Sequence, residues 1–142
     1  MDEENRQIRI GVKKDGGPPP TYQWSVGILD VAHEEAMSVL TPSQHRHMAL
    51  QVKELARQGD PTHSDLVDVE KVDDFYEIRD RGGPLGGINV RLFFAVVDSE
   101  RWMLVLGFIK KQNNGKTPLG DKTRMARRLR KFRSGEYGKL PI

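Results

Sequence analysis

Apolar positions along the chain follow two different periods, which divide it into strand-like and helix-like stretches. Alternation with a period of two predicts strands at residues 22–29, 75–80, 88–97 and 102–109. The last of these is apolar on both sides, which is typical of a central strand in a sheet. A helical period predicts two helices within residues 30–58 and a third within residues 117–133.

Local signals mark the starts of these helices. The TPSQ run at residues 41–44 combines a capping residue, a proline in the first turn and a capping-box glutamine. Asp30 is expected to cap the helix before it, so that two helices follow each other as an αα-hairpin. Glu35 falls outside the apolar stripe of that first helix and is expected to face solvent. Thr117 and Pro118 are expected to start the C-terminal helix.

Residues 1–21 are polar and end in prolines that cannot continue a helix or a strand ladder. We therefore expect a flexible leader over residues 1–21, with room for a short strand at residues 8–12, and one folded domain over residues 22–142. The chain has no cysteine and no apolar signal segment. Its longest apolar runs are far below the roughly 20 residues of a membrane helix. These features predict a cytoplasmic protein without a membrane partner.

Charge is distributed very unevenly along the chain, and this bears on the kind of partner that the protein binds. Residues 101–142 hold 12 Lys and Arg against 2 Asp and Glu, a local net charge of +10. Residues 1–100 have a local net charge of −7, so the formal net charge of +3 hides a strongly cationic end. Such asymmetry favours a polyanionic partner.

Two arginines are the first candidates for chemistry. Arg79 and Arg91 lie in neighbouring predicted strands and are expected to share one face of the sheet, where they could stabilise the charge of a phosphate. The structural alternative is that Arg79 pairs with Glu77 or Asp80, and that Arg91 pairs with Asp98. The sequence leaves both interpretations open.

Metal and histidine chemistry find less support. His45 and His47 are two residues apart on a helix, so they point in different directions and do not form a metal pair. The acidic residues between 60 and 74 lack a calcium-loop pattern. We expect no metal and no other cofactor. His63 and Tyr137 remain as further candidates for proton transfer.

Short motifs in a fixed order carry a resemblance to a known family. The chain reads YEIR from residue 76, INVRLFFAV from 88, GFIKK from 107, KTP from 116 and then a helix rich in Ala and Arg. This order and spacing resemble the RelE/ParE toxin superfamily, and within it the HigB-like, phage-derived branch. The departures are the proline-rich leader, a Val-Arg pair where Tyr-Arg is common, and the Asn-Asn-Gly run before KTP.

The resemblance implies a fold and a site. The implied fold is α+β and RelE-like: a small antiparallel sheet packed against an N-terminal α-hairpin, with a basic C-terminal helix. The implied basic active-site region, with catalytic roles, contains Arg79, Arg91, Lys71, Lys110 and Lys111. Residues expected to bind RNA around it are Lys116, Arg124, Arg127 and Arg128.

The resemblance also implies a function. The expected protein is the toxin of a type II toxin–antitoxin system, a ribosome-dependent endonuclease that cleaves mRNA without a metal and so inhibits translation. The expected partners are mRNA, the ribosome and a helix-turn-helix antitoxin. Two alternatives stay open: a ParE-like toxin that inhibits gyrase, and an inactive relative that binds RNA or docks an antitoxin.

Overall fold

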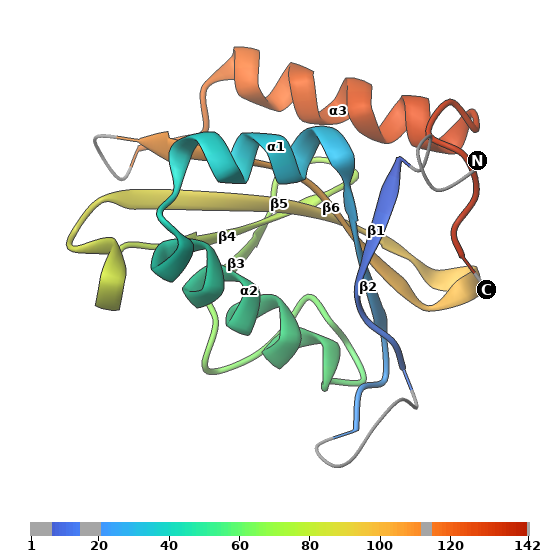
Figure 1. Ribbon diagram of the computed structural model, residues 1–142, viewed down its shortest axis with the longest axis horizontal. Coiled ribbons are helices and arrows are strands. Elements are labelled where there is room, and N and C mark those ends of the chain that lie inside the picture. Colours follow the sequence, from blue (N-terminus) through green and yellow to red (C-terminus); the bar gives the residue numbers. More distant parts are fainter. Residues whose placement is uncertain (1–6, 15–20, 112–114, 142) are drawn as a thin grey trace.

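A single six-stranded sheet with the order β1-β2-β6-β5-β4-β3 forms the centre of the molecule (Figure 1). The structure is a computed structural model that describes residues 7–14, 21–111 and 115–141. The strands are β1 (Ile8–Val12), β2 (Ser25–Leu29), β3 (Val69–Lys71), β4 (Tyr76–Asp80), β5 (Asn89–Val97) and β6 (Trp102–Lys111). The helices are α1 (Asp30–Val39), α2 (Pro42–Ala56) and α3 (Leu119–Arg133). The predicted α+β class is confirmed.

The sheet is larger than expected, and it is mixed rather than antiparallel. β2 runs parallel to β6, while all other neighbouring strands are antiparallel. Parallel neighbours need a long crossover, and here α1, α2 and the strands β3 to β5 provide it. β1 forms one edge of the sheet, and it occupies the range, residues 8–12, in which the sequence allowed a short strand. The other edge, β3, is three mostly exposed residues long and carries no usable period.

The two N-terminal helices lie on opposite faces of the sheet, so the expected packing of an α-hairpin against one side is wrong. α1 shares one face with α3, and α2 covers the other (Figure 1). Leu40, between α1 and α2, has an extended backbone with φ −119° and ψ 145°, which ends the first helix. At Thr41 the predicted capping box is confirmed, with reciprocal hydrogen bonds between Thr41 and Gln44. None of the described helices is long and apolar enough to cross a membrane.

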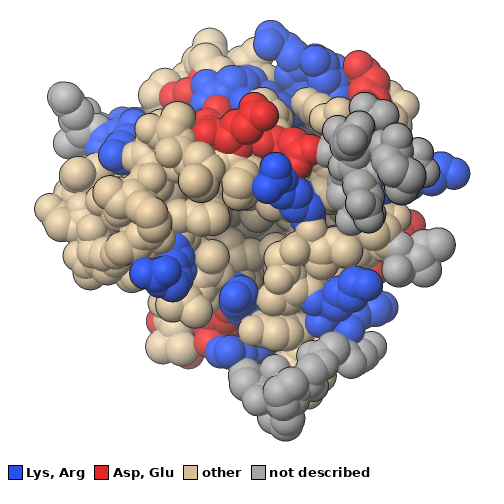
Figure 2. Space-filling view, in the orientation of Figure 1, with Lys and Arg blue, Asp and Glu red and all other residues tan. Residues whose placement is uncertain are grey.

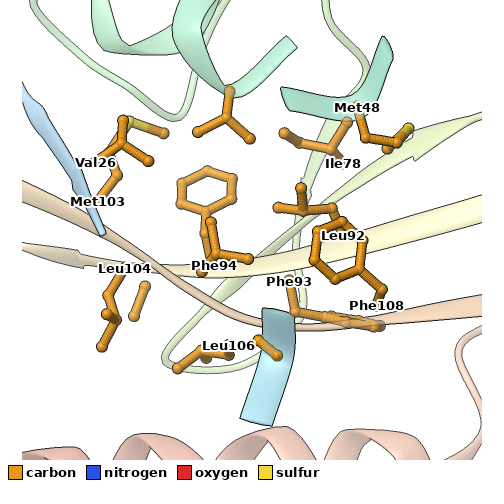
Figure 3. Packing of buried hydrophobic residues seen from close by; sticks show 14 of the residues in the cluster. Val26, Met48, Ile78, Leu92, Phe93, Phe94, Met103, Leu104, Leu106 and Phe108 are labelled. Atoms are coloured by element: carbon orange, nitrogen blue, oxygen red, sulfur yellow. The ribbon is translucent and has the colours of Figure 1, made fainter. Parts of the chain in front are cut away.

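The core lies on both sides of the two central strands, β5 and β6 (Figure 3). Leu92 and Phe94 point toward α2, while Phe93 between them points toward α1 and α3. Phe93 and Phe94 are fully buried. Burying a side chain of this kind contributes about 1.5–3 kcal/mol. The double-sided burial of β6 agrees with its uniformly apolar sequence.

Glu35 of α1 holds α3 to the sheet and does not face solvent, so the expectation of a solvated side chain is wrong. β2 pairs with β6 only as far as Val105. Beyond that point, the backbone N–H of Phe108 donates to Glu35 at 2.8 Å. Arg128 of α3 donates to both carboxylate oxygens of Glu35, at 2.9 and 3.0 Å, and also to the Leu106 carbonyl at 2.8 Å. Side chains therefore satisfy the main-chain groups that β2 leaves unpaired.

Gly107 lies directly beneath this ion pair. A Cβ atom at this position would stand 2.6 Å from both Glu35 Oε1 and Arg128 Nη1, and it would also overlap Met125 Cε. The glycine is therefore what allows α1 and α3 to approach β6 side by side.

Glu35→Ala is expected to lower the free energy of unfolding by about 2–3 kcal/mol, because it leaves the Phe108 N–H without its acceptor and the buried Arg128 guanidinium without its carboxylate partner. The matched control is Glu34→Ala, since Glu34 is the exposed neighbour on the same helix. Urea unfolding of both variants measures the difference. Equal stabilities of the two variants would contradict the role of Glu35.

Asp80, at the end of β4, joins α2 to the following glycine-rich turn. Its Oδ2 accepts a hydrogen bond from Gln51 at 2.6 Å and lies 2.7 Å from Nε2 of His47. Its Oδ1 accepts from the backbone N–H groups of Arg81 and Gly82. Burial raises the pKa of Asp80, but the hydrogen bonds outweigh it and hold this pKa below its ordinary value.

Asp80→Asn is expected to lower the free energy of unfolding at neutral pH. The difference in this free energy between the variant and the wild type should become smaller in acid. Because folding lowers the pKa of Asp80, its contribution is present above the unfolded-state pKa of about 3.9 and is lost as the pH falls through the folded-state value. Urea unfolding at pH 7 and at about pH 3 measures both differences. An equal difference in the free energy of unfolding at the two pH values would contradict this role of Asp80.

Candidate anion-binding cleft

A small cationic cleft opens where the β3 edge of the sheet meets the start of α3. Its volume is about 180 Å³. The residues that line it are Glu70, Lys71, Val72, Glu77, Arg79, Lys116, Thr117 and Lys122. Lys71, Lys116 and Lys122 form no ion pair with any residue that the structure describes. Four cations against two carboxylates leave the cleft positively charged.

A buried carboxylate organises the floor of the cleft. Glu77 is 1% exposed, and its Oε1 accepts from Arg79 at 2.7 Å. Its Oε2 accepts a short hydrogen bond from the Thr117 hydroxyl. Arg91 is equally buried; it donates to the same hydroxyl at 2.7 Å and to the Gly115 carbonyl. The network therefore ties β4 and β5 to the segment that carries Lys116.

The charges within this network balance each other. Arg91 Nη1 lies 3.9 Å from Glu77 Oε2, so each buried charge has an opposite charge nearby. Burial lowers the pKa of Arg91, and Glu77 acts in the opposite direction. Arg79 is the more exposed arginine, and it also contacts Glu70 at 3.0 Å at the rim of the cleft.

Thr117 does not cap α3, contrary to the sequence-based expectation. The helix begins at Leu119, Pro118 occupies the N-cap position, and no side chain there makes a capping hydrogen bond. The Thr117 hydroxyl is engaged by Glu77 and Arg91 instead. A buried ionic network thus takes precedence over a local cap.

Three of the five residues with predicted catalytic roles meet at or beneath the cleft. Arg79 and Arg91 are direct partners in the β4–β5 register and so share a sheet face, as expected. Arg79 lines the cleft, whereas Arg91 is buried under it. The proposed alternative pairing of Arg79 with Glu77 is present, while Arg91 pairs with Glu77 rather than with Asp98. Lys71 lines the cleft at the sheet edge, although its register partner Tyr76 belongs to the other face.

The remaining two lysines lie elsewhere. Lys110 and Lys111 end β6 opposite Val90 and Asn89. Together with the glycine-rich turn they line a separate hollow of about 680 Å³, and neither lines the cleft. The structure therefore does not bring the Lys-Lys pair to Arg79.

The residues predicted to bind RNA divide into exposed and engaged groups. Lys116 is exposed in the cleft, and Arg127 is exposed on α3 without an ion pair to the described residues. Arg128 is 8% exposed and is held by Glu35. Arg124 contacts both Asp121 and Glu35. Much of the positive charge on α3 nevertheless stays at the surface, at the top of the view in Figure 2.

The histidines do not contribute to the cleft. His63 is exposed in its loop, and Tyr137 is partly buried after α3. Within the described part of the chain, no group of three or more His, Asp or Glu side chains is arranged to hold a metal ion. The cleft itself offers cations, a hydroxyl group and two engaged carboxylates.

Sequence reasoning missed Glu77, Thr117 and Lys122 as parts of this site. Glu77 faces the same side as Arg79 by the strand period, and this pairing was available as a structural alternative. The contribution of Thr117 carried no local signal, because its partners are 26 and 40 residues away. Lys122 lies one helical turn after Pro118. It reaches the cleft only because α3 packs against this part of the sheet, which the local sequence does not indicate.

Comparison with known families agrees with a toxin-like chain. The sequence model described as phage derived protein Gp49-like (DUF891) matches residues 35–130. This is more than half of the chain, so the chain belongs to the Gp49-like phage-derived family, a toxin-like family related to the RelE/ParE superfamily. No curated protein matches the chain. Membership is consistent with the toxin of a toxin–antitoxin system, and the matched segment includes every residue that lines the cleft.

Thr117→Val is expected to lower the free energy of unfolding by about 1–3 kcal/mol, because Glu77 and Arg91 each lose a hydrogen-bond partner in a buried site. Thr117→Ser should restore most of this loss, since it keeps the hydroxyl group. Thr123→Val, at an exposed position of α3, is the matched control. Chemical denaturation compares the three variants, and a Thr117→Val variant as stable as the control would contradict the network.

Proposed function

We propose that this protein is the toxin of a type II toxin–antitoxin system and that it cleaves mRNA on the ribosome, without a metal, at the cationic cleft. Family membership supports the toxin role. The observation that carries the RNA assignment is the set of lysines in the cleft that have no acidic partner among the described residues, beside an arginine fixed by a buried carboxylate. Such a site suits the phosphate of a nucleic acid, which is singly charged and accepts several hydrogen bonds.

The proposed reaction uses the RNA's own 2′-hydroxyl as the nucleophile. The 2′-oxygen loses its proton to solvent and bonds to the adjacent phosphorus, while the bond from that phosphorus to the 5′-oxygen breaks. The products are a 2′,3′-cyclic phosphate and a 5′-hydroxyl that takes its proton from solvent. During this step negative charge builds on the non-bridging oxygens. Arg79 can face these oxygens with the part of its guanidinium that Glu77 and Glu70 do not occupy, and Lys116 lies on the same cleft. Fixed cations that meet charge as it develops are an effective form of catalysis.

The buried network would act by positioning. Arg91 and Thr117 hold the segment before α3, so that Lys116 and Lys122 face Arg79 across a narrow space. Preformed geometry avoids reorganisation of the site during the reaction. In this proposal Arg91 supports the site from below, and Lys110 and Lys111 contact the RNA outside the cleft.

The same charges suit the proposed partners. Exposed cations on α3 and in the cleft would contact ribosomal or messenger RNA, and an antitoxin would neutralise the toxin. We propose a helix-turn-helix protein as that antitoxin. The protein would act in the cytoplasm, where its substrate is found.

The test is primer extension on mRNA in a purified translation system. Wild-type protein should create new 5′ ends within codons, and Arg79→Ala should lower the cleavage rate on the order of 100-fold, because one transition-state donor is lost. Lys116→Ala provides a second variant with little risk to folding, since Lys116 is exposed. Arg46→Ala removes an exposed arginine from α2, on the other face of the sheet, and should cleave like the wild type.

Two outcomes would overturn parts of the proposal. Intact mRNA together with blocked DNA supercoiling by gyrase would replace the nuclease with a ParE-like toxin. Cleavage by both Arg79→Ala and Lys116→Ala at the wild-type rate would leave the nuclease in place but remove its assignment to this cleft.

A further inference from the structure

A second hollow lies on the α2 face of the sheet, away from the cationic cleft. Its volume is about 260 Å³, and it lies between α1, α2 and the edge formed by β1 and β2. Figure 2 shows the molecule hollowed between these elements, near the centre of the view. The lining residues central to its character are Ile10, Val12, Ala49, Val52, Lys53 and Phe108. We call it the helix–strand cavity.

The floor and walls of the helix–strand cavity are apolar. Val52 and Phe108 are buried, while Ile10 and Val12 of β1 are only partly covered. His45 packs edge-on against Phe108, with ring centroids 6.0 Å apart. Burial, and then the neighbouring His33, lower the pKa of His45 and so favour its neutral imidazole. The cavity is large enough for one large apolar side chain.

The rim of the helix–strand cavity is positive. Among the residues that the structure describes, Arg9 and Lys53 are the Lys and Arg side chains that line it, and no carboxylate does. Arg9 contacts Asp30 at 2.8 Å but is half exposed, whereas Lys53 forms no ion pair with the described residues. Arg46 is exposed two helical turns before Lys53, on the same flank of α2. A ligand that combines an apolar group with carboxylates would match this pattern.

We propose that the helix–strand cavity is the docking site for an acidic segment of the antitoxin, which inserts one large apolar side chain and places carboxylates beside Lys53 and Arg9. The identity of the partner rests on the proposed toxin function, while the chemistry of the contact rests on the cavity. A buried apolar anchor inside a charged rim is the arrangement found at the energetic centre of protein interfaces. The site also lies on the other face of the sheet from Glu77 and Arg79.

The experiment measures binding of the purified chain to the purified protein encoded beside it, by calorimetry. Ala49→Trp fills the cavity without changing charge, and Lys53→Glu reverses the charge of the rim. Each should weaken binding at least tenfold, about 1.4 kcal/mol. Leu50→Trp is the matched control, because Leu50 is the next residue on α2 and 59% exposed. It should change affinity by less than about twofold, a fraction of the loss expected at an interface centre.

Wild-type affinity of both Ala49→Trp and Lys53→Glu would overturn the docking proposal. Binding of decanoate that Ala49→Trp abolishes, with partner binding unchanged, would overturn it in favour of a small apolar carboxylate. Failure of the proposed function is separable, because mRNA cleavage is measured with the same preparations. Wild-type protein that cleaves mRNA but does not bind the adjacent protein removes the docking site alone. Cavity-dependent binding without any cleavage retains the docking site and removes the nuclease.

Discussion

The arrangement of the cleft depends on one buried carboxylate. Glu77 lies between two arginines and a threonine hydroxyl, in a position from which water is excluded. Without this carboxylate, the buried Arg91 and the partly exposed Arg79 would repel each other, and the lost solvation of Arg91 would cost several kcal/mol. With it, Arg91 can hold the segment before α3, and Arg79 can stand at the surface. The positive character of the cleft therefore rests on a negative group beneath it.

A second ion pair performs a similar task for the C-terminal helix. Glu35 and Arg128 meet over Gly107 and bring α1 and α3 together on one face of β6. Arg128 is thereby buried and paired with Glu35, whereas neighbouring cations of α3 remain at the surface. Docking of α3 in turn fixes where Lys122 stands relative to Arg79. Fold and candidate site are linked through these two carboxylates rather than through the hydrophobic core alone.

Local sequence patterns predicted the parts of the fold that local physics decides. The capping box at Thr41, the apolar double-sided β6 and the pairing of Arg79 beside Arg91 all follow from spacing. The parallel β2–β6 pairing and the separation of α1 from α2 did not, since both depend on contacts between distant segments. Thr117 shows the limit most clearly: its sequence context predicts a cap, but a buried network 26 to 40 residues away engages its hydroxyl.

The most direct test of the account is the salt dependence of binding between the purified protein and a short single-stranded RNA. A plot of log affinity against log salt concentration should have a negative slope, and each phosphate contact should make that slope steeper by about 0.7. Lys116→Ala/Lys122→Ala should therefore reduce the wild-type slope by roughly 1.4. Lys13→Ala/Lys14→Ala, at the opposite edge of the sheet, should leave the slope unchanged. A wild-type affinity indifferent to salt, or equal slopes for both double variants, would contradict a cationic cleft that binds RNA.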